Sequence, residues 1–310
     1  MPPFLIGGII MRTIAVIGLT DLGVTLARLL AATNRVDRLV FLDQDDQIAV
    51  GLAADLAASP APHCEVVIQD PAALKAADVL VVTIGQRFLG QPDSFAQLAG
   101  NVQAIQEWRS AVTESGFSGV VLNLATPNET LTGLIQQEWQ LPVQRVLGTG
   151  TITDTARLHQ VVAAAVEQPA SSVTGYMLGQ HDGNLVPIWS SVRVNGRSIE
   201  EPINGHSLDT AKLLVDVREE EYRVLTTVGK GSYTLCSWTL AILDVLLQNG
   251  STVLPVAVYQ PLYQCYMSFP AQITRAGVGQ FWLPRLYPVE EAQLKVAATA
   301  IKTQLTAMQG

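Results

Sequence analysis

Charge and cysteine are scarce in this chain of 310 residues. Charged residues make up 15% of it, the formal net charge is -8 at pH 7, and lysine and arginine form no cluster. Such a chain repels polyanions, so nucleic acid is not an expected partner. The three cysteines, Cys64, Cys236 and Cys265, are far apart and show no CxxC or adjacent histidine spacing. They suit a reducing compartment, which favours the cytoplasm, and they argue against structural zinc; we expect no bound metal.

Long apolar runs and targeting signals are also missing. No stretch reaches the ~18 uninterrupted apolar residues of a membrane helix, so we expect no membrane contact. Residues 1–10 are apolar but lack the basic segment and cleavage pattern of a signal peptide. We expect them to form a disordered extension ahead of Met11, an alternative start. With 48% hydrophobic residues and no repeat or low-complexity linker, the chain predicts two lobes of one compact unit.

An alternation of strands and helices fills the first half of the chain. Residues 13–18 form a β-branched run, and residues 22–32 continue with helical spacing. Five more strands are predicted at 38–43, 66–69, 78–83, 119–124 and 145–148, with helices that include 47–57 and 96–113. This pattern predicts an α/β fold with a doubly wound parallel sheet and right-handed crossovers.

The turn after the first strand resembles a dinucleotide-binding fingerprint. It has the first and third glycines of GxGxxG, Gly18 and Gly23, with Thr20 in place of the middle one. Asp43 ends the second strand about 20 residues on, where an acid accepts hydrogen bonds from a ribose diol and repels a 2′-phosphate. The pattern predicts a Rossmann domain over residues 1–148 that binds NAD. The candidate cofactor-binding residues are Gly18, Thr20, Asp21, Leu22, Gly23, Asp43, Thr83 and Gly85. The alternative is an ordinary βαβ unit that binds nothing.

The missing glycine has a physical meaning. The middle glycine lets backbone amides approach the pyrophosphate, and here the β-branched Thr20 and the anionic Asp21 stand there instead. This predicts a reduced affinity for the cofactor, although the helix N-terminus still offers amide donors to the phosphates.

Residues 149–157 separate this half from a different pattern. Asp154 and Arg157 are three residues apart and share a helix face, available together to a cleft. The alternative is structural, because residues 151–154 have the spacing of a capping box. His181 stands among glycines on a predicted turn, where an exposed histidine is the alternative. The rest of the chain predicts an α+β substrate domain over residues 149–310. Its expected elements are strands near 186–190 and 192–195, a hairpin at 267–277 and helices at 208–228, 237–247 and 289–304.

Several of these segments resemble one enzyme family. They are Gly148-Thr149-Gly150-Thr151, Asp154-Thr155-Ala156-Arg157, Gly179-Gln180-His181, Glu114-Ser115-Gly116-Phe117 and Leu254-Pro255-Val256. Together they resemble the lactate/malate dehydrogenase family, and most of all its L-2-hydroxyisocaproate dehydrogenase branch, from about residue 13 to the C-terminus. The resemblance implies an NAD-dependent transfer of hydride at C2 of an L-2-hydroxy or 2-oxo acid, and a homo-oligomer, a dimer or a tetramer.

The resemblance also implies roles for three side chains. His181 matches the acid/base that exchanges the hydroxyl proton, Asp154 matches the residue that orients it, and Arg157 matches the anchor of the substrate carboxylate. Each role fits the side chain, since histidine titrates near neutral pH and the planar donors of arginine match a carboxylate.

Two departures from the family concern the substrate. Ser94 stands where the family has an arginine that closes over the substrate, and Thr126 stands where it has an asparagine before proline. Loss of one donor to a developing oxyanion costs about 10²–10³ in rate. Arg87, on the loop at 86–93, is the candidate substitute for the missing cation.

Three functions stay open from the sequence. Phe88 and Leu89 on the same loop favour an apolar substrate side chain, of the 2-hydroxyisocaproate or lactate type. Malate dehydrogenase is an alternative that requires Arg87 to hold a second carboxylate. The third is a catalytically impaired paralogue that binds a nucleotide or an organic acid, suggested by Thr20, Ser94 and Thr126.

Overall fold

The structure, a computed structural model, describes residues 11–60, 64–85, 94–181, 183–205, 207–227 and 232–309. The predicted extension at residues 1–10 and the loop at 86–93 lie outside these ranges. Within them, no helix combines the length and the apolar character needed to cross a bilayer.

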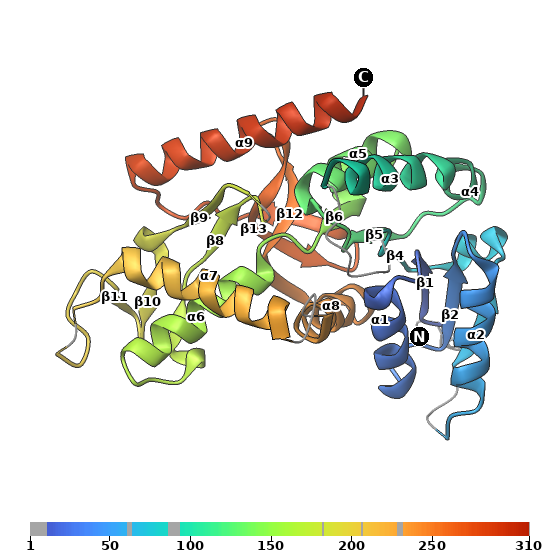
Figure 1. The fold of residues 1–310 in the computed structure, drawn as a ribbon, viewed down its shortest axis with the longest axis horizontal. Helices are drawn as coiled ribbons and strands as arrows, with labels where there is room; N and C mark the ends of the chain where they lie inside the picture. The colour runs from blue at the N-terminus through green and yellow to red at the C-terminus, as the bar shows by residue number, and fades with distance from the viewer. Residues whose placement is uncertain are drawn as a thin grey trace, which may run out of the picture.

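The first half alternates strands and helices as predicted (Figure 1). Its strands are β1 (Thr13–Ile17), β2 (Arg38–Leu42), β3 (Glu65–Ile68), β4 (Val79–Val82), β5 (Val120–Asn123) and β6 (Val146–Gly148). Its helices are α1 (Asp21–Ala32), α2 (Asp46–Ala57), α3 (Ser94–Glu107), α4 (Arg109–Glu114) and α5 (Asn128–Glu138), with short 3-10 helices at Pro71–Ala76 and Val143–Arg145. The strands pair in parallel in the order β3-β2-β1-β4-β5-β6, which confirms the doubly wound Rossmann-like sheet.

Both faces of this sheet are buried, which explains why its strands read as continuous apolar runs. Ile14 and Val16 of β1 belong to a core cluster with α1, while Ala15 and Ile17 belong to a second cluster with α5. Alternate residues of a strand point to opposite faces, so residues 14–17 of β1 all need apolar side chains.

The second half extends the same sheet. Its long elements are α6 (Ile152–Ala165), α7 (Thr210–Thr227), α8 (Ser232–Leu247), β12 (Ser251–Gln260), β13 (Cys265–Thr274), β14 (Gly277–Phe281) and α9 (Pro288–Gln309). Its short elements are β7 (Val173–Thr174), β8 (Met177–Gly179), β9 (Leu185–Pro187), β10 (Arg193–Val194) and β11 (Arg197–Ser198), with 3-10 helices at Ala170–Ser172 and Trp189–Ser191. The antiparallel strands β12 and β13 continue the sheet from β6, and β8 and β9 follow. In Figure 1, α9 runs over β12 and β13, while α6 and α7 lie together at the far end from α1 and α2.

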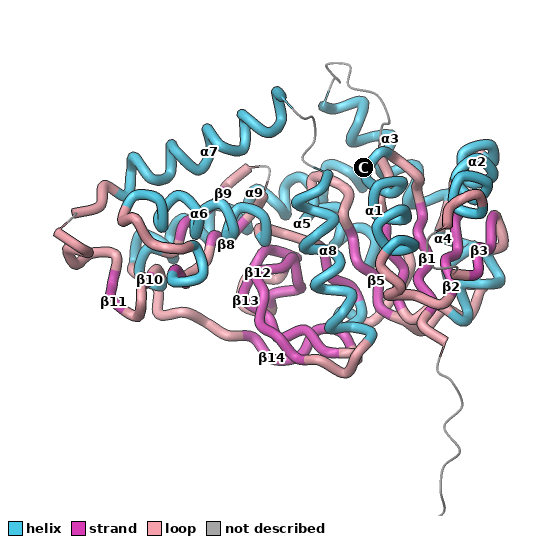
Figure 2. Tube along the Cα trace, turned by 90° about the horizontal axis from the view of Figure 1, so that it is seen from below, coloured by secondary structure: helices cyan, strands magenta, loops and turns pink. Residues whose placement is uncertain are grey.

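A separate core cluster holds α6 and α7 together. Leu158 and Val162 of α6 pack in it with Leu213 and Val217 of α7, and all four are buried. These residues are four apart within each helix, so each pair forms one apolar stripe. Figure 2 shows α7 extending away from the body of the molecule.

Two predicted elements differ from the structure, and one long strand was not predicted. The helix predicted at 96–113 is two helices, since α3 ends at Glu107 and α4 begins at Arg109. The hairpin predicted at 267–277 covers only part of a larger antiparallel arrangement. In the structure, β13 begins at Cys265 and pairs with both β12 and β14. The strand β12 was not predicted, because Pro255 interrupts its apolar run and proline is unusual inside a sheet.

Candidate active site

The carboxyl ends of β1 and β4 meet at the predicted cofactor turn. Gly18 has a φ of 83°, and a Cβ there would lie 2.9 Å from the backbone nitrogen of Ile84. A Cβ on Gly23 would overlap the hydroxyl of Thr83 and the carbonyl of Gly18. Both positions therefore require glycine, as the fingerprint expects.

Thr20 turns its hydroxyl away from the helix that follows it. Its Oγ1 donates to the carbonyl of Thr83 at 2.8 Å, and the hydroxyl of Thr83 donates to the carbonyl of Gly18. Thr20 is the N-cap residue of α1, yet its side chain makes no capping bond. The first-turn amides of α1 thus have no bond from this side chain and suit the phosphates of a dinucleotide. Asp21, exposed, and Leu22, half-buried, begin the helix.

Asp43 lies beside this turn at the end of β2. It is 8% exposed, and its Oδ2 accepts the backbone N–H of Leu19 while its Oδ1 accepts that of Asp45 at 2.8 Å. A carboxylate has about four acceptor positions, so these bonds orient Asp43 without using all of its capacity. The two required glycines, the α1 N-terminus and Asp43 fit NAD. Gly85 follows β4 at the same edge of the sheet.

The segment that leads into α6 is held by specific contacts. Gly150 has a φ of 53°, its N–H donates to Asn128 Oδ1 at 2.8 Å, and a Cβ on it would lie 2.3 Å from Ser268 Oγ. Thr151 donates to the carbonyl of Met177 at 2.6 Å, and Thr155 accepts the N–H of Met177 at 3.0 Å. The structural alternative, a capping box at residues 151–154, is therefore wrong, since the Thr151 side chain makes no cap bond. Both threonines instead fasten α6 to β8, the strand that leads to His181.

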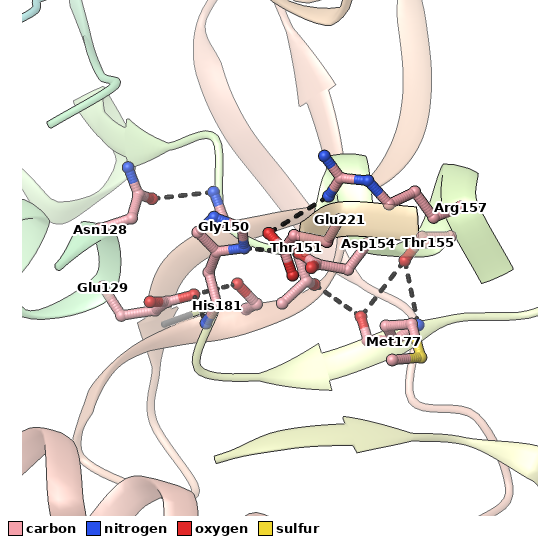
Figure 3. A network of polar contacts seen from close by, with 11 residues as sticks. Asn128, Glu129, Gly150, Thr151, Asp154, Thr155, Arg157, Met177, His181 and Glu221 are labelled. Atoms are coloured by element: carbon pink, nitrogen blue, oxygen red, sulfur yellow. Dashed lines mark hydrogen bonds and ion pairs between the residues drawn. The ribbon is translucent and has the colours of Figure 1, made fainter. Parts of the chain in front are cut away.

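His181 and Asp154 meet across this junction (Figure 3). His181 Nδ1 lies 2.7 Å from Asp154 Oδ2, and the Asp154 side chain is 1% exposed. An ionised carboxylate only accepts, so Nδ1 carries the hydrogen and Nε2 carries the lone pair of a base. The other oxygen of Asp154, Oδ1, is buried and has no hydrogen-bond partner among the described residues. His181 lies on a turn, as predicted.

Arg157, one helical turn after Asp154, is paired with an acid that the sequence did not single out. Its Nη1 lies 3.4 Å from Oε1 of Glu221 on α7, and the two side chains are 13% and 37% exposed. A carboxylate oxygen of Asp154, a ring nitrogen of His181 and a carboxylate oxygen of Glu221 all lie within 4.8 Å of one another. Figure 3 shows the Arg157–Glu221 pair beside the His181–Asp154 pair.

A second acid, Glu129 on α5, lies behind His181. It is fully buried, and its Oε1 accepts the backbone N–H of His181 at 3.1 Å and the hydroxyl of Ser268 at 2.6 Å. Burial raises the pKa of Glu129 from 4.5 to about 7, opposed by the hydrogen bond from Ser268 and by the charge of His181. Glu129 therefore positions the His181 backbone and titrates near neutral pH.

The structure describes only some of the candidate residues from the loop at 86–93, from the beginning of α3 and from the segment after β5. Arg87, Phe88 and Leu89 lie outside the described residues. Ser94 is the first residue of α3. Thr126 lies between β5 and α5, and its carbonyl accepts from the side chain of Asn101 at 3.0 Å.

The sequence carried one signal for Glu221 and little for Glu129. Leu213, Val217 and Glu221 are spaced four apart, so Glu221 stands where the apolar stripe of α7 would continue. An acid at such a position faces the neighbouring helix rather than solvent. Glu129 follows Thr126-Pro127-Asn128, and nothing local in the sequence indicates that it is buried.

Comparisons with known proteins agree with this architecture. A family model described as the NAD binding domain of lactate/malate dehydrogenase matches residues 12–148, and one for the alpha/beta C-terminal domain of that family matches residues 151–309. The chain is 28% identical over 311 residues to an L-lactate dehydrogenase of Treponema denticola, covering 96% of this chain and 98% of the relative. It is 26% identical over 307 residues to one of Gloeobacter violaceus, covering 95% and 93%.

Solved structures give the same result. A minor L-lactate dehydrogenase from Enterococcus mundtii in the ligands-bound form superposes with a TM-score of 0.87 at 26% identity, covering 96% of this chain and 98% of the other. A lactate dehydrogenase from Cryptosporidium parvum complexed with lactic acid and NAD has a TM-score of 0.88 at 22% identity, which shows the shared fold.

A Rossmann-like sheet that matches an NAD binding domain, followed by an α/β domain of the same family, defines the class as an NAD-dependent oxidoreductase. The chain belongs to the lactate/malate dehydrogenase family. NAD, the predicted cofactor, is confirmed by the match to the family's NAD binding domain.

Proposed function

We propose that this protein transfers hydride between NAD and C2 of an L-2-hydroxy or 2-oxo acid with an apolar side chain, of the 2-hydroxyisocaproate or lactate type. One observation carries the proposal: His181 is bonded to the buried Asp154 at 2.7 Å, with Arg157 one helical turn further along α6. A base, its orienting carboxylate and a carboxylate anchor are the groups that this reaction needs from the protein.

His181 and Asp154 move and stabilise the proton. NAD, when bound, supplies the acceptor of the hydride that leaves C2. As the hydroxy acid becomes an oxo acid, Nε2 of His181 takes the hydroxyl proton, and in the reverse direction it returns the proton to the carbonyl oxygen. Asp154 holds the ring through Nδ1 and stabilises the imidazolium by its charge.

Arg157 is the proposed anchor of the substrate carboxylate. Its planar guanidinium offers parallel N–H donors that match a carboxylate bidentately. An apolar substrate side chain is supported by Phe88 and Leu89 in the sequence and by relatives that are named L-lactate dehydrogenases. Malate would need a second cation, and Arg87 remains the candidate for it.

A second candidate function is a paralogue that binds its ligands and turns them over slowly. Ser94 and Thr126 replace two donors of the family, and the structure adds that Glu221 already pairs with Arg157. Each lost oxyanion donor is worth about 10²–10³ in rate, so a site that lacks two retains little turnover unless Arg87 supplies one.

A titration and a substrate scan distinguish these functions. NADH binding is measured by fluorescence, and NADH oxidation is then followed with pyruvate, branched 2-oxo acids and oxaloacetate. The proposed dehydrogenase binds NADH and oxidises it fastest with an apolar 2-oxo acid. Binding of NADH without turnover on any acid supports the impaired paralogue, and fastest turnover of oxaloacetate supports malate dehydrogenase.

We also propose the remaining features of the protein. Residues 1–148 form the cofactor domain and residues 149–310 the substrate domain. The chain assembles as a homo-oligomer, a dimer or a tetramer, which light scattering at micromolar concentration tests. Its three cysteines are free in the structure, which suits the reducing cytoplasm.

A further inference from the structure

Glu221 reaches the proposed substrate site because of how α6 and α7 pack. Leu213 and Val217 of α7 are buried against Leu158 and Val162 of α6. One turn beyond Val217, the same face of α7 brings Glu221 to the side chain of Arg157 in the second turn of α6. The buried interface between the two helices thus fixes the position of Glu221. An ion pair between two side chains in solvent has no such support.

The carboxylate of Glu221 lies where a substrate would lie. It is paired with Arg157 at 3.4 Å through Nη1, a terminal nitrogen that a bidentate carboxylate fork uses. It also lies within 4.8 Å of ligand atoms of both His181 and Asp154. A 2-oxo acid held between His181 and Arg157 would occupy the same small volume.

We propose that Glu221 is an internal competitor of the substrate carboxylate for Arg157, and that it makes the site select monocarboxylic 2-oxo acids. The inference rests on the proposed function, which assigns Arg157 to the substrate. A bound 2-oxo acid takes over the guanidinium as the Glu221 side chain turns away, so part of the binding free energy is spent on breaking the pair.

The same charge explains the selectivity. Glu221 lies on the guanidinium of Arg157, and one of its carboxylate oxygens lies within 4.8 Å of a carboxylate oxygen of Asp154. A monocarboxylate replaces Glu221 on Arg157 and leaves the charge at that guanidinium unchanged. A dicarboxylate brings an additional negative charge next to the displaced Glu221, and like charges at this range in a partly buried site are unfavourable.

The test replaces Glu221 and uses its neighbour as the control. Glu221→Gln keeps the size of the side chain and removes its charge. Glu220→Gln removes the same charge one residue away, from a side chain that is 46% exposed and pairs with Arg223 on the surface. Oxamate, a carboxylate analogue of a 2-oxo acid, is titrated into each variant at saturating NADH, and thermal unfolding checks that both variants fold.

A partly buried pair of this kind is worth roughly a three- to tenfold change in affinity. Glu221→Gln should therefore bind oxamate about three- to tenfold more tightly and lower the KM for pyruvate, with kcat little changed. The ratio of kcat/KM for pyruvate to kcat/KM for oxaloacetate should be smaller in Glu221→Gln than in the parent. Glu220→Gln should match the parent in all of these.

Failure of the inference and failure of the proposed function give different results. If the parent reduces 2-oxo acids but Glu221→Gln binds oxamate no more tightly, Glu221 does not compete for Arg157, and the function stands. If neither the parent nor Glu221→Gln binds oxamate or reduces any 2-oxo acid, a released Arg157 holds no carboxylate, and both proposals are wrong.

Discussion

Replacement of Asp154 by asparagine tests the proton-transfer pair most sharply. The change keeps the shape of a side chain that is 1% exposed, and it removes the charge that lies 2.7 Å from His181 Nδ1. With the two charges centred about 4 Å apart and an effective dielectric constant of about 20, that charge stabilises the imidazolium by about 4 kcal/mol. Since about 1.4 kcal/mol is tenfold in rate, kcat for 2-oxo acid reduction should fall by about 10³.

Steady-state NADH oxidation measures this loss, and a pH profile identifies its cause. Reduction needs a protonated His181, and without Asp154 the ring holds its proton less well. The pH at which the reduction rate falls to half should therefore be lower in Asp154→Asn than in the parent. Asp216→Asn, which removes a carboxylate paired with Lys212 on α7, is the matched control and should change neither quantity. An Asp154→Asn variant within about threefold of the parent rate, with an unshifted profile, would refute the assigned roles.

Four further predictions concern Arg157, Glu129, Ser94 and Asp43. Arg157→Lys keeps the charge but loses the planar fork, so oxamate binding should weaken about tenfold or more with little change in unfolding free energy; unchanged binding would place the anchor elsewhere. Burial raises the pKa of Glu129 from 4.5 to about 7, so the folded state holds a proton that the unfolded state has lost, and stability falls as pH rises across that window. Glu129→Gln removes this contribution. In urea unfolding, the free energy of unfolding of the variant relative to the parent should therefore rise by up to about 3 kcal/mol between about pH 5 and about pH 8. A difference that stays constant between the two pH values would contradict the raised pKa. Ser94→Arg should raise the 2-oxo acid reduction rate by up to about 10²–10³, and further with Thr126→Asn; if Arg87 already fills that role, Arg87→Ala should abolish the activity instead. Asp43, the proposed ribose ligand, should make NADH bind more tightly than NADPH in a fluorescence titration, and equal affinities would contradict that role.

The parallel sheet could be predicted because its strands are buried on both faces. Runs such as residues 14–17 and 79–82 are apolar at every position, and Gly18 marks the turn after the first of them. Local patterns of this kind give strand, turn and helix directly. The strand β12 was missed because Pro255 cannot donate a ladder bond, and the break at Trp108 was missed because helical spacing continues across it.

The candidate site was only partly predictable, because some of its residues are far apart in the sequence and meet only in the folded chain. His181 and Asp154 were found through motifs, and the structure bonds them. Glu221 meets Arg157 across 64 residues of sequence, through a packing of α6 on α7 that no local pattern encodes. Glu129 acquires its raised pKa from complete burial behind His181, which is a property of the folded state alone.

The proposed reaction transfers hydride from NADH to C2 of a 2-oxo acid that lies beside His181, Asp154 and Arg157. The most direct test supplies NADH deuterated at the carbon that donates hydride, together with an apolar 2-oxo acid, and examines the product by mass spectrometry and chiral chromatography. One deuterium is expected at C2 of the L-2-hydroxy acid, and no labelled product is expected when His181→Ala replaces the parent. NADH that binds but leaves no deuterium on any 2-oxo acid, or label that persists in His181→Ala, would contradict it.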